Sequence, residues 1–260
     1  MIESRQNKIV KKIELLKNKK DRDKTGLFVV EGERFVNEIP NNNFIDMFAV
    51  SESYEKSHDI SDIQKKGNVF VLSDNIFKLC CDTENPQGIL AVCKKQNISP
   101  EEIIPNNSKN GFYIIAEELN DPGNLGTIIR TADAAGACGI FLTKGSVDLY
   151  NPKVLRSTMG AIFHVDIYQN CDLESTVKLL KNNDISIYAA HLKGEKYPYD
   201  FDLKKGTAFM IGNEARGLSQ KAVSLCDELT KLPILGQAES LNASMAAGIL
   251  MYEVVRQRIV

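Results

Sequence analysis

Three features are absent from this chain of 260 residues, and each absence narrows the class of protein. No apolar run approaches the roughly 18 residues that a membrane-spanning helix needs, so we expect no membrane partner. The first residues, MIESRQNK, lack the apolar core of a signal peptide. The six cysteines form no CxxC and no cysteine–histidine ligand spacing, which disfavours a zinc site and predicts free thiols. We therefore expect a cytoplasmic protein without a bound metal.

The chain also lacks an excess of one charge, because its net charge is −2. The distribution is uneven, however. Residues 1–24 hold nine basic and four acidic side chains, which makes this segment +5 and leaves −7 for the remainder. A basic start on an acidic body favours a polyanionic partner. A helix face that only keeps the protein in solution explains the same pattern, and composition does not separate the two.

The order of apolar and polar segments predicts two folded parts. Residues 1–95 read as a small α/β unit, and residues 95–111, rich in Asn, Ser and Pro, are typical of a linker. From residue 112 onward we expect strands at 112–119, 139–143, 162–168, 185–192, 207–212 and 228–235, and helices at 124–135, 151–161, 173–182 and 242–258. This alternation predicts a mostly parallel sheet covered on both faces, with ligands bound at the carboxyl ends of its strands.

The loop NDPGNLGTIIR follows the first of these strands and opens a helix, where Asn124 is a candidate N-cap. The GxGxxG spacing of a dinucleotide-binding loop is absent, so we exclude a Rossmann site. The apolar residues of the helix cover one arc, and Arg130 points roughly away from it, with Gly126 and Ala134 one turn before and after. Arg130 is therefore either a solvent-facing charge or a functional group on a face cleared for close approach.

Two later loops follow strands in the same way. IGNEARGLS places Gly212, Asn213 and Glu214 at a strand end, where glycine permits close backbone approach to a ligand and Glu214 is either functional or a turn residue. LPILGQAESLNAS places Ser240 and Asn242 at the start of a helix that is apolar or small nearly all round, which predicts burial, including burial against another subunit. Simple capping by Ser240 or Asn242 accounts for these two residues equally well.

These three loops, in this order and at these distances, resemble the three motifs of the SpoU (TrmH-type) RNA 2'-O-ribose methyltransferases of the SPOUT superfamily. The helix NPKVLRSTMGA is also similar to that family. The N-terminal region that contains RQNKIVKKIELLKNKKDRDKTGLFVVEGERFVNE resembles the accessory substrate-binding domain of many members. The resemblance divides the chain into an RNA substrate-binding domain at 1–96, a linker at 97–110 and a methyltransferase domain at 111–260.

The resemblance implies both a fold and an activity. The fold is a mostly parallel α/β sheet with a trefoil knot, here over about residues 207–245, behind a smaller ribosomal-protein-like α/β domain. The activity is transfer of a methyl group from S-adenosylmethionine to a ribose 2'-hydroxyl of rRNA or tRNA, with rRNA favoured, which leaves S-adenosylhomocysteine. Members form homodimers through the knot region and the last helix, and the reaction needs no metal.

The motif positions of the family carry over to individual residues. The cofactor is expected at Gly212 and Asn213 and between three apolar side chains that suit the faces of an adenine ring, Leu232, Ile234 and Leu241. The polar positions around the reacting ribose are Asn124, Arg130, Glu214, Ser240 and Asn242. Basic side chains of the first segment are expected to contact RNA phosphates, namely Arg5, Lys11, Lys12, Lys19, Lys20 and Arg22.

Two roles are open for Arg130. It either accepts the ribose proton in a site that lowers its pKa, or it binds phosphate and stabilises the developing alkoxide while Glu214 or water takes the proton. We favour the second role, because a guanidinium with a pKa above about 12 is a poor base. Three rival hypotheses are an inactive RNA-binding protein of the same fold, a base methyltransferase of the superfamily, and a nucleotide-binding enzyme with residues 1–95 as a lid.

Overall fold

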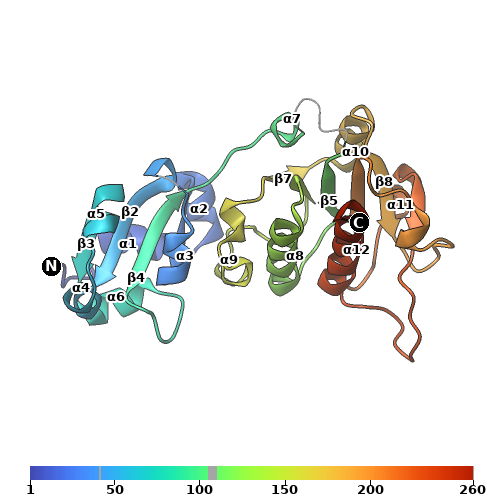
Figure 1. Cartoon of the computed structure of the whole chain (residues 1–260). Coiled ribbons are helices and arrows are strands. Elements are labelled where there is room, and N and C mark those ends of the chain that lie inside the picture. Colours follow the sequence, from blue (N-terminus) through green and yellow to red (C-terminus); the bar gives the residue numbers. More distant parts are fainter. Residues whose placement is uncertain (41, 105–109, 260) are drawn as a thin grey trace. The chain divides into compact units, whose positions relative to one another are not determined.

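The computed structural model describes residues 1–40, 42–104 and 110–259 (Figure 1). The chain forms two compact units. The N-terminal unit comprises Met1–Gln96 together with Tyr150–Phe163, and the C-terminal unit comprises Asn97–Leu149 together with the chain from His164 onward. Within the described residues, no helix is both long enough and apolar enough to cross a bilayer.

The N-terminal unit is a four-stranded sheet covered by short helices. Its strand order is β1-β4-β2-β3, with only β2 and β3 parallel. The strands are β1 (Leu27–Glu31), β2 (Ile45–Ser51), β3 (Val69–Leu72) and β4 (Ile89–Lys94). The helices are α1 (Lys8–Leu15), α2 (Lys19–Thr25), α3 (Glu33–Asn37), α4 (Glu52–Ser57), α5 (Ser61–Lys66) and α6 (Asp74–Cys80). Val10 and Ile13 of α1 pack with Leu72 and Phe77 in one apolar core.

A segment from the middle of the chain completes the N-terminal unit. Helix α9 (Pro152–Thr158) and the short turn η2 (Ala161–Phe163) lie in residues that the strand–helix alternation assigned to the C-terminal domain. The ring of Tyr150 lies 4.6 Å from that of Phe28, and the ring of Phe163 lies 5.8 Å from that of Phe35. This assignment could not be predicted from local sequence patterns, because the aromatic contacts join residues far apart in the chain.

Replacing Phe163 with alanine should therefore loosen the N-terminal unit. Phe163 is only half-buried, so we expect a loss of about 2 kcal/mol, below the range for a fully buried phenylalanine. Hydrogen exchange should speed up in β1 and α3, which hold its ring partners Phe28 and Phe35. Tyr168→Ala is the matched control, because Tyr168 contacts Phe141 in the C-terminal unit. Faster exchange in the C-terminal sheet alone for Phe163→Ala would contradict the assignment.

The C-terminal unit holds the parallel sheet that the alternation predicted. Its strand order is β10-β8-β9-β5-β6-β7, and every neighbouring pair is parallel. The strands are β5 (Phe112–Ala116), β6 (Gly139–Thr143), β7 (Ile167–Cys171), β8 (Ser186–Ala190), β9 (Thr207–Ile211) and β10 (Glu228–Thr230). Strands β5, β6 and β9 are buried along their whole length, as expected for a sheet covered on both faces.

Helices cover this sheet. They are α7 (Pro100–Ile103), α8 (Pro122–Ala135), α10 (Leu173–Lys181), α11 (Gln220–Leu225) and α12 (Ala243–Ile259), with a short turn η3 (Pro198–Asp200). Helices α8 and α12 pack against each other and lie side by side in Figure 1. Tyr113 and Ile115 of β5 share a core with Val177 of α10 and Ala222 of α11. Because alternate side chains of a strand point to opposite faces, Tyr113 and Ile115 lie on the same face of the sheet, and α10 and α11 cover that face.

Several expected boundaries differ from the structure. The strand expected at 228–235 ends at Thr230, and Lys231, Leu232 and Ile234 line the pocket instead. The strand expected at 162–168 begins only at Ile167. Part of the expected linker is folded, since Ser99 and Glu102 form a capping box that starts α7 and Ile103 is buried. Residues 105–109 of that linker lie outside the described residues. The trefoil knot expected over about residues 207–245 stays a prediction.

Candidate active site

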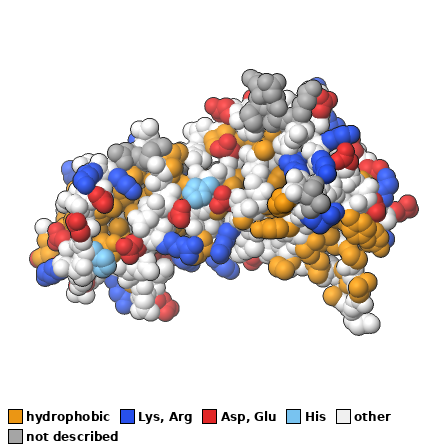
Figure 2. Space-filling model, viewed as in Figure 1, with side chains coloured by type: hydrophobic (Ala, Val, Ile, Leu, Met, Phe, Trp, Pro, Cys, Tyr) orange, Lys and Arg blue, Asp and Glu red, His pale blue; other side chains and the backbone are white. Residues whose placement is uncertain are grey.

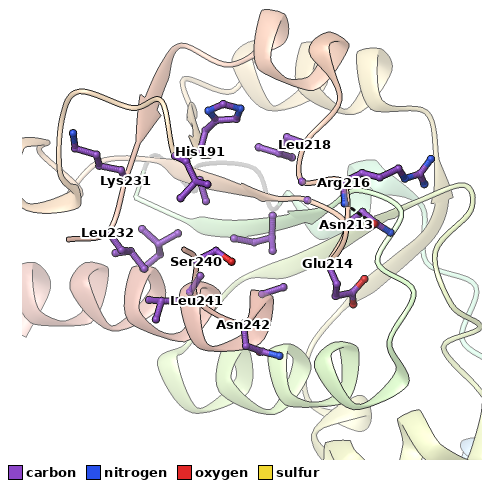
Figure 3. Close-up of a pocket in the computed structure, with 18 of the residues that line it drawn as sticks. His191, Asn213, Glu214, Arg216, Leu218, Lys231, Leu232, Ser240, Leu241 and Asn242 are labelled. Atoms are coloured by element: carbon purple, nitrogen blue, oxygen red, sulfur yellow. Dashed lines mark hydrogen bonds between the residues drawn. The ribbon is translucent and has the colours of Figure 1, made fainter. Parts of the chain in front are cut away.

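A pocket of about 860 Å³ opens at the carboxyl ends of β5, β8, β9 and β10 (Figure 3). Its size falls within the range of small-molecule sites. Glu214 and Asn242 lie on one side of it, and His191 and Lys231 lie on another. The lining includes all but one of the residues expected around the cofactor and the ribose: Asn124, Gly212, Asn213, Glu214, Leu232, Ile234, Ser240, Leu241 and Asn242. The exception is Arg130.

The carboxylate of Glu214 joins the loop after β9 to the loop after β5. It accepts hydrogen bonds from the backbone N–H groups of Asn120 at 3.1 Å and Asp121 at 3.0 Å, and from Nδ2 of Asn124 at 3.1 Å. Partial burial alone would raise the pKa of the Glu214 carboxyl, but these hydrogen bonds outweigh it and hold that pKa below its usual range. Glu214 is therefore an anion that orders the loop, and a weak proton acceptor.

Asn124 sits inside helix α8 and does not cap it, contrary to the sequence-based expectation. The N-cap is Asp121, whose Oδ1 accepts the N–H of Asn124 at 2.7 Å, and Pro122 occupies the first helical turn, where its missing N–H costs nothing. Asn124 is buried, with Nδ2 donating to Glu214 and Oδ1 accepting from Nδ2 of Asn242 at 2.9 Å. Its amide is thereby held in one orientation at the pocket wall.

Asn242 caps the last helix. Its Oδ1 accepts hydrogen bonds from the backbone N–H of Ser244 at 2.9 Å and the hydroxyl of Ser244 at 2.7 Å, which satisfies the start of α12. Its Nδ2 bonds to Asn124. The chain Glu214–Asn124–Asn242 thus connects three loops that are distant in sequence, and we call it the polar bridge. Ser240 lines the pocket but makes no hydrogen bond with the described residues.

The turn after β9 is held by its own backbone and by Asn213. A Cβ on Gly212 would collide with the backbone of Gly217, so glycine is required here by the turn itself. Oδ1 of Asn213 accepts the N–H groups of Ala215 at 3.0 Å and Arg216 at 3.1 Å, and its Nδ2 donates to the carbonyl of Glu118 at 2.8 Å. Asn213 was expected to bind the cofactor and lines the pocket, and its side chain also fixes the turn.

The loop after β8 also lines the pocket, through His191, Leu192 and Lys193, and the sequence analysis missed it. Nδ1 of His191 accepts the N–H of Lys193 at 3.0 Å, which orients the imidazole ring at the pocket wall. Lys231, which follows β10, was missed as well. The rule applied to the other loops did not find them, because the strands expected at 185–192 and 228–235 included both residues, whereas β8 and β10 end just before them.

Arg130 does not line the pocket of its own chain. It is exposed on α8 and makes no hydrogen bond or ion pair with the described residues. Thr127 and Ala134, one helical turn before and after, are also exposed. Gly126, which was expected on the same face, is buried instead, so the close-approach role of Arg130 stays a prediction. Within one chain the structure does not bring Arg130 to the polar bridge.

The six basic residues that were expected to contact RNA divide into three groups. Lys11, Lys19 and Lys20 are exposed. Arg5 pairs with Glu14 at 2.9 Å and Lys12 with Asp46 at 2.8 Å, so their charges are partly compensated. The third group is Arg22 alone, which is 4% exposed and whose guanidinium donates to the carbonyls of Leu16 and Lys17, both at 2.8 Å. Arg22 is therefore a structural residue that closes the end of α1 and is not accessible to RNA.

The sequence and the fold match known methyltransferases. Residues 111–252 match the family model described as SpoU rRNA Methylase family, and residues 7–91 match an MRM3-like substrate binding domain. The chain is 35% identical over 252 residues to the 23S rRNA (guanosine(2553)-2'-O)-methyltransferase RlmP of Bacillus subtilis, covering 96% of this chain and 97% of that protein.

Solved structures agree with this match. The AdoMet-bound rRNA methyltransferase from Sinorhizobium meliloti superposes with a TM-score of 0.87 at 29% identity, covering 98% of this chain and 97% of that one. The SpoU methyltransferase AviRb from Streptomyces viridochromogenes, in complex with AdoMet, gives a TM-score of 0.86 at 26% identity, covering 98% and 99%. These matches, together with the parallel α/β sheet, define the chain as an RNA 2'-O-methyltransferase. The chain belongs to the SpoU rRNA methylase family.

Proposed function

We propose that this protein transfers a methyl group from S-adenosylmethionine to the 2'-hydroxyl of a ribose in ribosomal RNA and releases S-adenosylhomocysteine. The observation that carries this proposal is the pocket at the strand ends, bordered by the polar bridge. Two structural relatives hold AdoMet, and RlmP is named as an rRNA 2'-O-methyltransferase. The free thiols of all six cysteines support a reducing compartment, and we place the reaction in the cytoplasm.

The pocket residues fit the cofactor by their chemistry. Leu232, Ile234 and Leu241 offer apolar surface to the adenine, and the turn of residues 212–218 presents backbone groups to its polar edges. Bound S-adenosylmethionine supplies a sulfonium-activated methyl group, which needs no metal to react. The task of the protein is to hold the ribose oxygen in line with that methyl group.

The polar bridge positions the ribose. Asn124 and Asn242 are fixed by hydrogen bonds on both sides, and Ser240 has a hydroxyl free of partners within the described residues to meet the substrate. A bond forms between O2' and the methyl carbon, the carbon–sulfur bond breaks, and the O2' proton leaves. Because both Glu214 oxygens already accept hydrogen bonds and its pKa is lowered, we assign the proton to water and the positioning of the loop to Glu214.

We infer that the protein is a homodimer joined through the exposed faces of α8 and α12. Hydrophobic side chains gather over α12 and the loop before it (Figure 2). Met245, Ile249 and Tyr252 follow each other at helical spacing and are 59%, 45% and 52% exposed. Arg130 lies on the adjoining helix and outside its own pocket, so we propose that it acts in the pocket of the partner subunit. There it would bind the RNA phosphate and stabilise the developing alkoxide.

A charge placed on α12 should separate the subunits. Ile249→Asp puts a carboxylate into the proposed interface, where burial without a partner costs several kcal/mol. We expect a monomer by size-exclusion chromatography with light scattering, whereas the unaltered protein is a dimer. Leu15→Asp is the matched control, because Leu15 is 51% exposed but lies in the N-terminal unit. A dimeric Ile249→Asp protein would move the interface elsewhere.

The activity itself is tested by locating the methyl group. The protein is incubated with radiolabelled S-adenosylmethionine and unmodified rRNA or tRNA transcripts, and the RNA is digested to nucleosides for mass spectrometry. We expect a 2'-O-methylnucleoside from rRNA. A methyl group on a base would support the base-methyltransferase hypothesis instead, and absence of S-adenosylmethionine binding by calorimetry, with RNA present, would support an inactive RNA-binding protein.

A further inference from the structure

A second candidate RNA contact lies beside the pocket, on the segment 196–201 that contains η3, which we call the tyrosine turn. The rings of Tyr197 and Tyr199 stack 5.1 Å apart at an angle of 18°. Tyr199 is 56% exposed, so a large aromatic surface faces solvent. Neither tyrosine belongs to the core or to the pocket lining. Packing of the protein interior therefore does not account for this stacked pair.

The tyrosine turn is held rigidly. The backbone N–H of Tyr197 donates to Oδ2 of Asp200 at 2.8 Å, and the N–H of Asp200 donates to the carbonyl of Tyr197 at 3.0 Å. Nζ of Lys196 lies 2.6 Å from Glu228 of β10, and Phe201 packs on Tyr188 of β8 with ring centres 4.6 Å apart. The rings are thus presented in a fixed position, which lowers the entropy cost of binding.

Positive charge accompanies the rings and links them to the pocket. The ammonium of Lys231 lies 5.4 Å from the centre of the Tyr197 ring, and the N–H of Lys231 donates to the carbonyl of Lys196 at 3.0 Å. Lys231 also lines the pocket, as does Lys193, which lies on the loop that leads into the tyrosine turn. A stacking surface and two lysines therefore border the place where a ribose must approach the methyl group.

We propose that the tyrosine turn binds an unpaired base of the RNA substrate next to the methylated nucleotide, with Tyr199 stacking on the base and Lys231 contacting a neighbouring phosphate. This inference rests on the proposed function, because it requires an RNA substrate in the pocket. Bases that are splayed out of a helix are recognised by stacking on aromatic side chains, and every base offers such a face. The site would thus select for unpaired RNA at the target and leave the base identity to other contacts.

The test replaces Tyr199 by alanine and by phenylalanine. Tyr199→Phe keeps the ring and should behave like the unaltered protein, whereas Tyr199→Ala should raise KM for rRNA by about fivefold to a hundredfold, the range for loss of one stacked base. The kcat at saturating RNA and the calorimetric affinity for S-adenosylmethionine should not change, because Tyr199 does not line the pocket. An unchanged KM for Tyr199→Ala would overturn the proposal, as would an equal loss in Tyr199→Phe.

A binding measurement separates this inference from the proposed activity. The probes are a fluorescein-labelled single-stranded RNA of about 12 nucleotides and the duplex formed with its complement, followed by anisotropy. The unaltered protein should prefer the single strand, and Tyr199→Ala should lose that preference. If the protein methylates no RNA yet shows this difference, the activity fails and the stacking site stands. If it methylates rRNA while both proteins bind the two probes alike, the stacking site fails alone.

Discussion

Replacing Arg130 with alanine should lower the rate of methyl transfer by at least about a hundredfold, the usual effect of removing one donor to a developing oxyanion. The protein should still fold and bind S-adenosylmethionine, because Arg130 is exposed and does not line its own pocket. Single-turnover rates with saturating rRNA measure the chemical step. Arg216→Ala is a useful comparison, since Arg216 is an exposed arginine that lines the pocket and pairs with Glu118; we expect a smaller loss from it. Near-normal rates for Arg130→Ala would remove this residue from the mechanism.

Mixed dimers decide in which pocket Arg130 works. A heterodimer is prepared from one Arg130→Ala protomer and one Asn242→Ala protomer, each inactive as a homodimer. If Arg130 serves the partner's pocket, the pocket with an intact Asn242 also receives an intact Arg130, and about half of the activity returns. If Arg130 serves its own pocket, each pocket lacks one group and the heterodimer stays inactive. The second outcome would contradict the arrangement that we propose.

Replacing Glu214 with glutamine should reduce methyl transfer by about tenfold to a hundredfold, corresponding to the loss of about 1–3 kcal/mol in the bonds that order the loop after β5. The glutamine amide would turn an N–H donor toward the backbone N–H groups of Asn120 and Asp121, which now donate to the Glu214 carboxylate. Glu117→Gln is the matched control, because Glu117 also orders a turn, through the N–H and hydroxyl of Ser219, outside the pocket. We expect it to retain most activity.

A double mutant distinguishes positioning from proton transfer. Asn124→Ala removes another member of the polar bridge, and if both residues act only by holding the same loop, the double mutant should be no slower than the slower single mutant. If Glu214 instead accepts the proton, Asn124→Ala should retain methyl transfer, with a rate that falls in acid as Glu214 becomes protonated. Glu214→Gln should then abolish methyl transfer. A double mutant whose rate loss equals the product of the two single-mutant losses would contradict a purely positioning role.

We also expect the contribution of Glu214 to the free energy of unfolding to depend on pH. Because the pKa of Glu214 is lowered in the folded protein, its contribution to stability is fully present above the unfolded value, about 4.3, and is lost as pH falls through the folded value. The difference in urea midpoint between the unaltered protein and Glu214→Gln should therefore be constant at neutral pH and shrink in acid. A difference that grew in acid would reverse the sign of the assigned shift.

Much of the C-terminal fold could be predicted from the sequence. Strand β6 begins and ends where its apolar run does, and the alternation of strands and helices is sufficient to predict a parallel sheet. The loops with Asn124, Glu214 and Asn242 follow strands or begin helices, so a shared location at one edge of the sheet follows from the topology of parallel strands. These features depend on the spacing of apolar and polar residues along a short stretch of chain, which can be read from consecutive residues.

Other features depend on contacts between residues that are distant in the sequence, and these contacts are visible only in the folded chain. Phe163 belongs with Phe28 and Phe35, and Arg22 is a buried donor to carbonyls, not a surface charge. No spacing in the chain distinguishes a lysine or arginine that faces water from one that closes a helix end.

The sequence alone was enough to predict the family, the order of the C-terminal elements and most of the residues that meet at the pocket, but not His191 or Lys231. The tertiary structure decided how they meet: Asp121 starts α8, Asn124 bridges Glu214 and Asn242, and Arg130 lies outside its own pocket. The physical reason is that helix and strand periodicity comes from the backbone of neighbouring residues, whereas hydrogen-bond partners and burial come from the path of the whole chain.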